Sequence, residues 1–392
     1  MHHRGPIMRI AALLGVPLLM AIAATTWTAS QASADTPLTI NMGVGSGTVA
    51  GNVYTPGEFT VHTGDSVTVG VTSDEPHSLT FGSGPSNESP DQWPSTFPNQ
   101  GPDLGTMDFD GTGFANTALM FNGQTATFHF TAPGTFEFSC EIHPGMTGTV
   151  HVVAADQNAD TQTTLDQKAS QTSTAVLAQV DPLKAATTAQ VTSQDRNDGT
   201  KLWKIFTNAI NDPAAQPGGG TGYLELLQFI PPDLPIHQGD TVEWDARGVH
   251  SVTFIPAGQT PDQLEAQYGG DPFAVPPSKP SDNYDASQVY NSGMFFAGPG
   301  APTSFSLTFT QTGTFPYLCL LHEELGQTGT ITVAARAATA TPTPTPAALP
   351  QTGGPPQGGG GMSWLAWLML GGGLAMLASG VSLGLRRVSR SL

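Results

Sequence analysis

Two histidines and one cysteine recur at matching spacings in the two halves of this 392-residue sequence. Each half has a Cys-x-x-His motif and, far upstream, a histidine that opens a His-Ser-x-Thr-Phe segment. The six residues are His77, Cys140 and His143 in the first half and His250, Cys319 and His322 in the second. One thiolate and two imidazoles, with a weak axial fourth group, form the trigonal ligand set of an electron-transfer copper site. The repeat therefore predicts two copper sites that cycle between Cu(I) and Cu(II).

The fourth, axial group differs between the halves. In the first half Met146 follows His143 at the spacing of an axial ligand. In the second half the same forward count reaches Leu325, which cannot ligate. Counting backward from the shared Thr-Gly-Thr strand instead aligns Gln327 with Met146. Because that strand fixes the axial residue in space, we predict Gln327 as the ligand. An amide oxygen is harder than a thioether and favours Cu(II), so any internal electron transfer would run from the Gln327 site to the Met146 site.

Two alternatives to this prediction remain open. The motif cysteines are the only cysteines in the sequence, so a Cys140–Cys319 disulfide is possible, although a bridge would explain neither histidine. The second half could also have kept its fold and lost its copper. There Glu323 replaces the proline that follows His143, and Glu324 adds a further charge beside the histidine.

Strand patterns around these residues also repeat. A short strand, a Gly-Asp turn and an alternating strand cover 59–69 in the first half and 234–244 in the second. The 46 glycines, 33 prolines and 11% charged residues suit a turn-rich all-β protein. The predicted parts are a β-sandwich domain at 35–154, a linker at 155–199 that could be partly helical, and a second β-sandwich domain at 200–335.

Both termini carry targeting patterns. Residues 1–34 have a short basic start, an apolar run and a final Ala-Ser-Ala, which predicts a secretory signal cleaved before Asp35. Residues 336–361 form a Thr/Pro/Gly-rich spacer that contains Leu-Pro-Gln-Thr-Gly. The apolar run at 362–385 is long enough for a transmembrane helix, and the basic tail at 386–392 would hold its end in the cytoplasm. An uncleaved N-terminal anchor and a plain single-pass anchor are the alternatives.

On these motifs the sequence resembles two families. Both halves resemble cupredoxins of the plastocyanin, azurin and halocyanin type. The first copper loop is similar to that of amicyanin, and the second resembles plastocyanin with a glutamine of the stellacyanin kind. This resemblance implies two eight-stranded Greek-key sandwiches, with His143 and His322 as electron ports at an exposed apolar patch. The order of Leu-Pro-x-Thr-Gly, apolar span and basic tail resembles a cell-wall sorting signal, which implies cleavage by a sortase.

The charge and the histidine content of the sequence narrow the range of possible functions. Residues 35–352 hold all 31 acidic groups against eight of the 13 basic ones, a net charge of −23. This excludes nucleic acid as a partner and predicts steering toward a redox protein with a basic docking surface. The sequence contains no His-x-His pair of the kind that multicopper oxidases carry, so a catalytic copper oxidoreductase is disfavoured. We predict a non-enzymatic electron carrier on the outer face of the membrane or in the cell wall, with copper capture or storage as the alternative.

Overall fold

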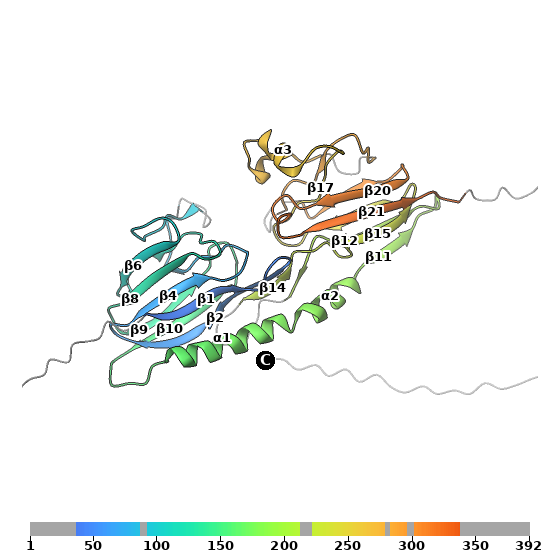
Figure 1. The fold of residues 1–392 in the computed structure, drawn as a ribbon. Coiled ribbons are helices and arrows are strands. Elements are labelled where there is room, and N and C mark those ends of the chain that lie inside the picture. Colours follow the sequence, from blue (N-terminus) through green and yellow to red (C-terminus); the bar gives the residue numbers. More distant parts are fainter. Residues whose placement is uncertain (1–36, 87–91, 212–221, 279–282, 296–301, 338–392) are drawn as a thin grey trace, which may run out of the picture. The chain divides into compact units, whose positions relative to one another are not determined.

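The computed structural model describes residues 37–86, 92–211, 222–278, 283–295 and 302–337, and its regular structure is mainly β-sheet with few helices (Figure 1). The predicted signal segment, Leu-Pro-Gln-Thr-Gly motif, transmembrane helix and basic tail all lie outside these residues. Among the residues described, no helix is both long and apolar enough to span a bilayer.

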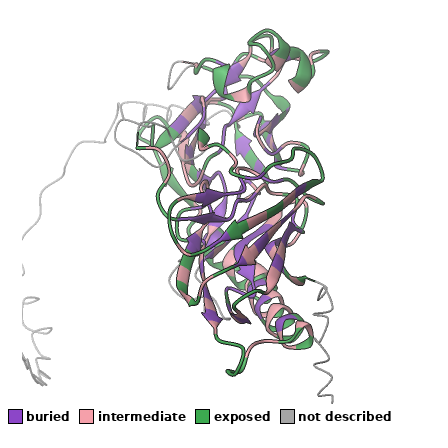
Figure 2. Cartoon of the chain, turned by 90° about the vertical axis from the view of Figure 1, so that its left-hand side faces the viewer, coloured by how far each residue is buried: buried purple, intermediate pink, exposed green. Residues whose placement is uncertain are grey.

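The first half contains two β-sheets that share one core. One sheet holds, in spatial order, β2 (Val49–Thr55), β1 (Leu38–Val44), β4 (Ser66–Val71), β8 (Thr125–Phe130) and β6 (Asp103–Phe109). The other holds β3 (Glu58–His62), β10 (Thr147–Val153), β9 (Gly134–Ser139), β5 (Thr80–Phe81) and β7 (Ala115–Asn116). Burial alternates along β8 and β10, because successive side chains of a strand point to opposite faces. Figure 2 shows the chain coloured by burial, with buried residues in purple. The buried ring of Phe81 lies in this core and contacts the rings of Phe109, Phe128, Phe130 and Phe138.

The second half repeats the order of the β3-to-β7 sheet in full and the order of β1, β4 and β8 in the other sheet. One sheet holds β15 (Asp233–His237), β21 (Thr328–Ala334), β20 (Gly313–Leu318), β17 (Thr253–Phe254) and β18 (Tyr290–Asn291). The other holds β11 (Thr192–Asp195), β12 (Lys201–Phe206), β16 (Thr241–Asp245) and β19 (Ser304–Thr308). The parallel pairing of β3 with β10 recurs as that of β15 with β21. The fully buried Trp244 contacts the rings of Phe254, Phe305 and Tyr317 in this second core. The long loop between β17 and β18 carries α3 (Pro261–Ala266) and the 3-10 helix η2 (Pro272–Ala274).

The segment predicted as a linker contains two helices, α1 (Gln162–Leu177) and α2 (Val180–Thr188). The side chain of Thr161 caps α1 by accepting a hydrogen bond from the backbone N–H of Thr164, which satisfies one of the free donors of the first turn. Leu165 at the start of α1 joins the core of the first half, and Val176 near its end is also fully buried. The helix therefore packs against the first sandwich.

The two halves share a β-sheet. After β12 the chain forms β13 (Ala209–Ile210) and β14 (Tyr223–Leu226), and β14 pairs antiparallel with β2. These strands fall in the range assigned to the second domain, yet they extend the first sheet to seven strands. In the first half, β1 pairs with the strand that follows it in sequence, β2. In the second half, the equivalent strand β12 pairs instead with the strand that precedes it, β11. Because β11 occupies that edge of β12, β13 and β14 are available to pair with β2.

Candidate metal centres

Paired strands and short loops position the first group of predicted ligands. Cys140 follows β9, and β9 pairs with β10, so the loop between them is closed at its base. The backbone N–H of Cys140 donates to the carbonyl of Met146 at 3.0 Å, and that of Met146 donates to the carbonyl of His143 at 2.9 Å. His77 comes just before β5, where two backbone hydrogen bonds with Met120 hold it in place.

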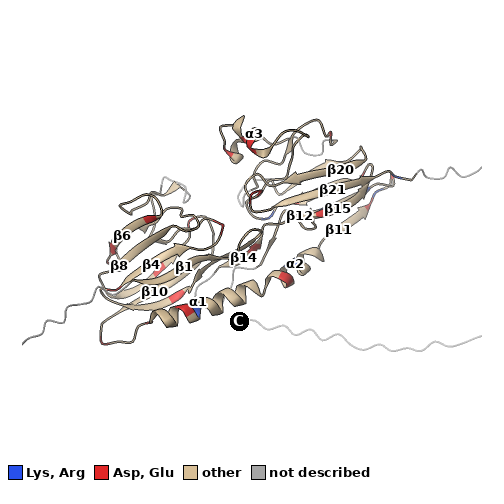
Figure 3. Ribbon diagram, in the orientation of Figure 1, with Lys and Arg blue, Asp and Glu red and all other residues tan. Residues whose placement is uncertain are grey.

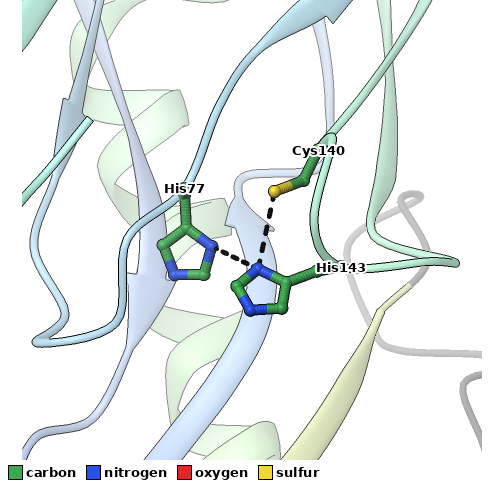
Figure 4. Close-up of side chains that lie close together, drawn as sticks. All are labelled: His77, Cys140 and His143. Carbon is green, nitrogen blue, oxygen red and sulfur yellow. Dashed lines mark hydrogen bonds between the residues drawn. The ribbon is translucent and has the colours of Figure 1, made fainter. Parts of the chain in front are cut away.

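His77, Cys140 and His143 form a buried group (Figure 4). The two Nδ1 atoms lie 3.0 Å apart, and the Sγ of Cys140 lies 3.4 Å from the Nδ1 of His143. The backbone N–H of Ser78 donates to this sulfur at 3.4 Å. Met146 is fully buried in the same cluster of side chains as Cys140. A sulfur and two imidazole nitrogens that converge in this way match the donor set of a copper site.

The second group has nearly the same geometry. The Nδ1 atoms of His250 and His322 lie 3.1 Å apart. The Sγ of Cys319 lies 3.9 Å from the first of these nitrogens and 3.6 Å from the second. The backbone N–H of Ser251 donates to the sulfur at 3.3 Å, as Ser78 does in the first group. The two cysteines are not bonded to one another, so the disulfide alternative does not hold in this structure.

Gln327 lies at the backbone position that Met146 occupies in the first half. The backbone N–H of Cys319 donates to the carbonyl of Gln327 at 3.1 Å, as that of Cys140 does to Met146. The side-chain Oε1 lies 2.9 Å from Nδ1 of His250 and 3.1 Å from Nδ1 of His322. Its Nε2 donates to the carbonyl of Thr207 at 2.7 Å. Because that bond engages the amide nitrogen, the amide oxygen is the atom directed at the centre.

The upstream histidines have different partners on their second ring nitrogen. Nε2 of His77 lies 2.9 Å from the hydroxyl of Ser73, whereas Nε2 of His250 lies 2.9 Å from Oε1 of Glu225. Asn208 also donates to that carboxylate. With Nδ1 facing the centre, Nε2–H donates to these groups, an arrangement that orients the ring and sets its basicity. The first centre therefore has a neutral partner and the second a charged one.

Without a metal, the pKa values of the corresponding histidines and cysteines therefore differ between the two centres. Burial, reinforced by repulsion from His143, holds the pKa of His77 well below its usual value. Burial also acts to lower the pKa of His250, but hydrogen bonds to Cys319 and Glu225 and their charges outweigh it and raise the pKa to about 10. Burial raises the pKa of the Cys140 thiol. For Cys319 the opposing effect of both histidines outweighs burial and lowers the pKa well below its usual value. The second centre therefore favours a thiolate without a metal.

The outer edges of the downstream histidines are covered rather than exposed. His143 is 7% exposed and His322 is 6% exposed. The ring of Tyr223 meets the ring of His143 edge-on at 6.2 Å, and Oε1 of Glu75 lies 3.7 Å from Nε2 of His322. Burial lowers the pKa of His143 to about 4, with an opposing contribution from Glu225 and a further lowering by His322. The expectation that both rings reach the surface at an apolar patch is wrong, because each ring is buried beside a residue from the other half.

Sequence reasoning missed four residues around the centres, namely Ser73, Glu75, Tyr223 and Glu225. The sequence does offer one signal for Glu225, because this acidic residue lies between the apolar residues Leu224 and Leu226 in a strand. A buried carboxylate needs a partner, and a ligand histidine is a suitable one. The partner itself lies 25 positions away and follows only from the tertiary fold.

Comparison with known proteins gives one family match and several solved structures. Residues 39–153 match the family described as copper binding proteins, plastocyanin/azurin family. A reduced mutant of amicyanin is similar at 23% identity and a TM-score of 0.21, over 31% of this chain and 86% of that one. A pseudoazurin from Sinorhizobium is similar at 15% identity and a TM-score of 0.20, over 33% of this chain and 72% of that one. Likenesses of this size carry no conclusion about function. None of the curated proteins matches the chain.

The family match covers less than a third of the chain, and it includes all three ligands of the first group. The donor set of the second group is the same, two imidazole nitrogens and one sulfur. Copper is the metal that this family binds, and both groups fit it. Residues 39–153 thus match a copper-binding family, and the chain holds two groups of side chains suited to copper.

Proposed function

We propose that this chain is a surface-anchored electron carrier with two type 1 copper centres. The observation that carries the proposal is the pair of buried His-Cys-His groups, each with its donor atoms within 4.8 Å of one another. A soft thiolate suits Cu(I) and imidazole suits both oxidation states, so such a centre can cycle with little movement of its ligands. His77, Cys140 and His143 would hold copper in the first half, and His250, Cys319 and His322 in the second.

The axial groups give the two centres unlike potentials in this proposal. The first half offers the thioether of Met146, and the second offers the amide oxygen of Gln327, directed by its bond to Thr207. A carboxylate beside His250 adds negative charge to the second centre. Both features favour Cu(II) at the second centre and lower its reduction potential relative to that of the first centre. The first centre is then the electron acceptor of the pair.

External partners are proposed to be redox proteins with a basic docking surface. Acidic side chains greatly outnumber basic ones over residues 35–352, and the described part of the first β-sandwich carries no Lys or Arg (Figure 3). A surface of one sign accelerates encounter with a partner of the other sign, by an amount that falls with ionic strength. The rate of electron exchange with a basic redox protein should therefore drop as salt rises. A rate that is independent of salt would remove charge steering from the proposal.

The anchoring part of the proposal rests on the sequence of the termini. A secretory signal at 1–34, the Leu-Pro-Gln-Thr-Gly motif and an apolar span at 362–385 support export, retention at the cell surface and sortase processing. The test is fractionation of cells that express the chain, alongside a Thr352→Ala variant. Covalent attachment to wall material that the variant loses would support sortase processing. Recovery of both proteins in the membrane fraction would leave a plain single-pass anchor.

The decisive experiment counts copper and records its spectra. Copper is loaded into three proteins, namely the full chain and its Cys140→Ser and Cys319→Ser variants. For each protein we would measure the metal content, the visible absorption spectrum and the electron paramagnetic resonance spectrum. Two coppers per chain, with one distinct thiolate-to-copper signal lost in each variant, are the expected result. One copper, lost only in Cys140→Ser, would make the second half a structural domain. Tight Cu(I) binding without either signal would favour copper capture or storage instead.

A further inference from the structure

The two candidate centres are joined by two direct connections. The described residues of both halves belong to one unit that ends at Ala337. Each connection begins at a ligand histidine of one centre and ends at a ligand histidine of the other. The first connection uses the ring of His322 and the second uses the ring of His143, and each of these rings lies against a residue of the other half.

The first connection runs through Glu75. Its Oε1 lies 3.7 Å from Nε2 of His322, and its side chain is 12% exposed. Glu75 is separated from His77 by a single residue, Pro76. A short covalent segment therefore links the outer edge of a second-centre ligand to the backbone of a first-centre ligand.

The second connection runs through β14. The ring of Tyr223 contacts the ring of His143, and Oε1 of Glu225 lies 2.9 Å from Nε2 of His250. Residues two apart on a strand point to the same face, so one face of β14 presents both side chains.

The surroundings of β14 hold these connections in place. Tyr223 and Glu225 are paired with Asn52 and Ala50 of β2 in a regular antiparallel ladder. Beyond the strand, the N–H of Leu227 donates to the carbonyl of Thr48 at 2.9 Å. Apolar side chains from both halves and from α1 pack into one buried cluster at this point. They are Val44, Val53, Val176, Phe206, Ala209, Leu224, Leu226 and Ile230.

We propose that the two centres exchange an electron directly within the chain, through the Glu75 segment and β14. This inference rests on the proposed electron-transfer function. With copper held by the His-Cys-His group of each half, Cu(I) at the second centre would be oxidised to Cu(II) while Cu(II) at the first would be reduced to Cu(I). One electron moves, no bond is made or broken, and no other reactant is needed. External partners then dock elsewhere than at the edges of His143 and His322, since each half covers the port of the other.

The first test uses the metal-free full chain, so it is independent of copper loading. Histidines are labelled with diethylpyrocarbonate and located by mass spectrometry. We expect His143 and His322 to be protected and the exposed His237 to be labelled. The variant Tyr223→Leu should lose the protection of His143, and Tyr268→Leu, the same change at a 38% exposed tyrosine, should not. Equal labelling of all three histidines in the parent chain would overturn the proposal.

The second test measures internal electron transfer after rapid reduction of the copper-loaded chain. The expected result is a fast phase whose rate is independent of protein concentration. Tyr223→Leu and Glu75→Ala should each slow this phase, and the combined variant should abolish it. The control Glu243→Ala removes a carboxylate that pairs with Lys204 outside the centres, and it should leave the phase intact.

The two tests separate this inference from the proposed function. Absence of thiolate-to-copper spectra in the loaded chain would end the proposed function and leave the labelling result standing. Normal spectra at both centres, with exchange only between molecules, would overturn the internal route while the carrier function survives. Dipolar coupling between the two Cu(II) signals gives a further readout that needs no turnover, and its absence would count against the route. Should an alanine variant fail to fold, Glu75→Gln keeps the side-chain volume and tests the same carboxylate.

Discussion

Replacing Glu225 by glutamine removes the charge that acts on His250 and keeps the size of the side chain. Burial acts to raise the pKa of Glu225, but the hydrogen bond and charge of His250 outweigh it and lower the pKa, so the carboxylate is ionised at neutral pH. Its oxygen lies 2.9 Å from Nε2. Across the ring, a metal at Nδ1 would be ~7 Å away, where two unit charges interact by about 2.4 kcal/mol at an effective dielectric constant of ~20.

Cu(II) carries one unit of charge more than Cu(I), so this energy is the expected difference between the two states. It corresponds to about 60-fold in relative affinity and to a rise of ~100 mV in the reduction potential of the second centre. The value falls within the ~10–100-fold that outer-shell partners of metal ligands typically contribute. The assay is a spectroelectrochemical titration in a Cys140→Ser background, in which the second centre alone is followed.

The matched control for this prediction is Glu243→Gln, because the carboxylate of Glu243 pairs with Lys204 at 2.8 Å rather than with a histidine of either centre. We expect the control to leave the potential unchanged. A Glu225→Gln potential that equals the control, or that moves downward, would refute the assignment of this carboxylate as a partner of a ligand. Loss of copper from the variant at the loading concentration would be measured separately, by competition with a chelator.

Three further predictions concern the first centre, the core and the acidic surface. Gly43 has φ +78°, and a Cβ there would overlap the Ser73 hydroxyl and the His77 ring. Gly43→Ala should therefore weaken copper binding at the first centre, whereas Gly123→Ala, with φ +84° and no atom within 4 Å, should cost only the ~1–2 kcal/mol of backbone strain in unfolding experiments. Phe81→Ala should lower the free energy of unfolding by about 3–5 kcal/mol, while Phe121→Ala at a 58% exposed site should change it by less than ~0.5 kcal/mol, as measured by denaturant titration. Burial and then the charges of Glu265, Asp262 and Glu324 raise the pKa of Glu323 from 4.5 to about 7, so the folded metal-free protein holds this proton longer than the unfolded chain. Stability should then fall as pH rises from 4.5 to 7, and Glu323→Gln should flatten that slope; an unchanged slope would contradict the shift.

The sequence predicted which histidines and cysteines come together, because their spacing is local or repeated. Cys140 and His143 are three positions apart on one loop, and the matching second copy identified His250 and His322 without any knowledge of the fold. The alignment from the final strand also located Gln327 beside the second group, where its amide oxygen lies 2.9 Å from His250. Its role as a ligand stays a prediction.

The relation between the halves could not be predicted in the same way. Strand alternation identifies β14 as a strand but does not say which edge it pairs with, and its partner β2 lies more than 160 positions earlier. The cover that Tyr223 gives to His143 follows from that pairing, so the expectation of exposed ring edges, which came from the family resemblance, was wrong. Glu75 lies two positions before His77, yet its contact with His322 spans almost 250 positions and follows from the tertiary fold alone.

The pairing of β14 with β2 also bears on how the chain avoids self-association. Four residues of β2, Val49 to Asn52, are paired with β14, and without it their backbone N–H and C=O groups would lie along an open sheet edge. Open edges of this kind recruit strands from other molecules and seed aggregates. A truncated chain that ends after the first β-sandwich would therefore expose an unpaired sheet edge to other molecules. The second half thus caps an edge of the first, and the chain truncated after the first β-sandwich is expected to aggregate more readily than the full chain.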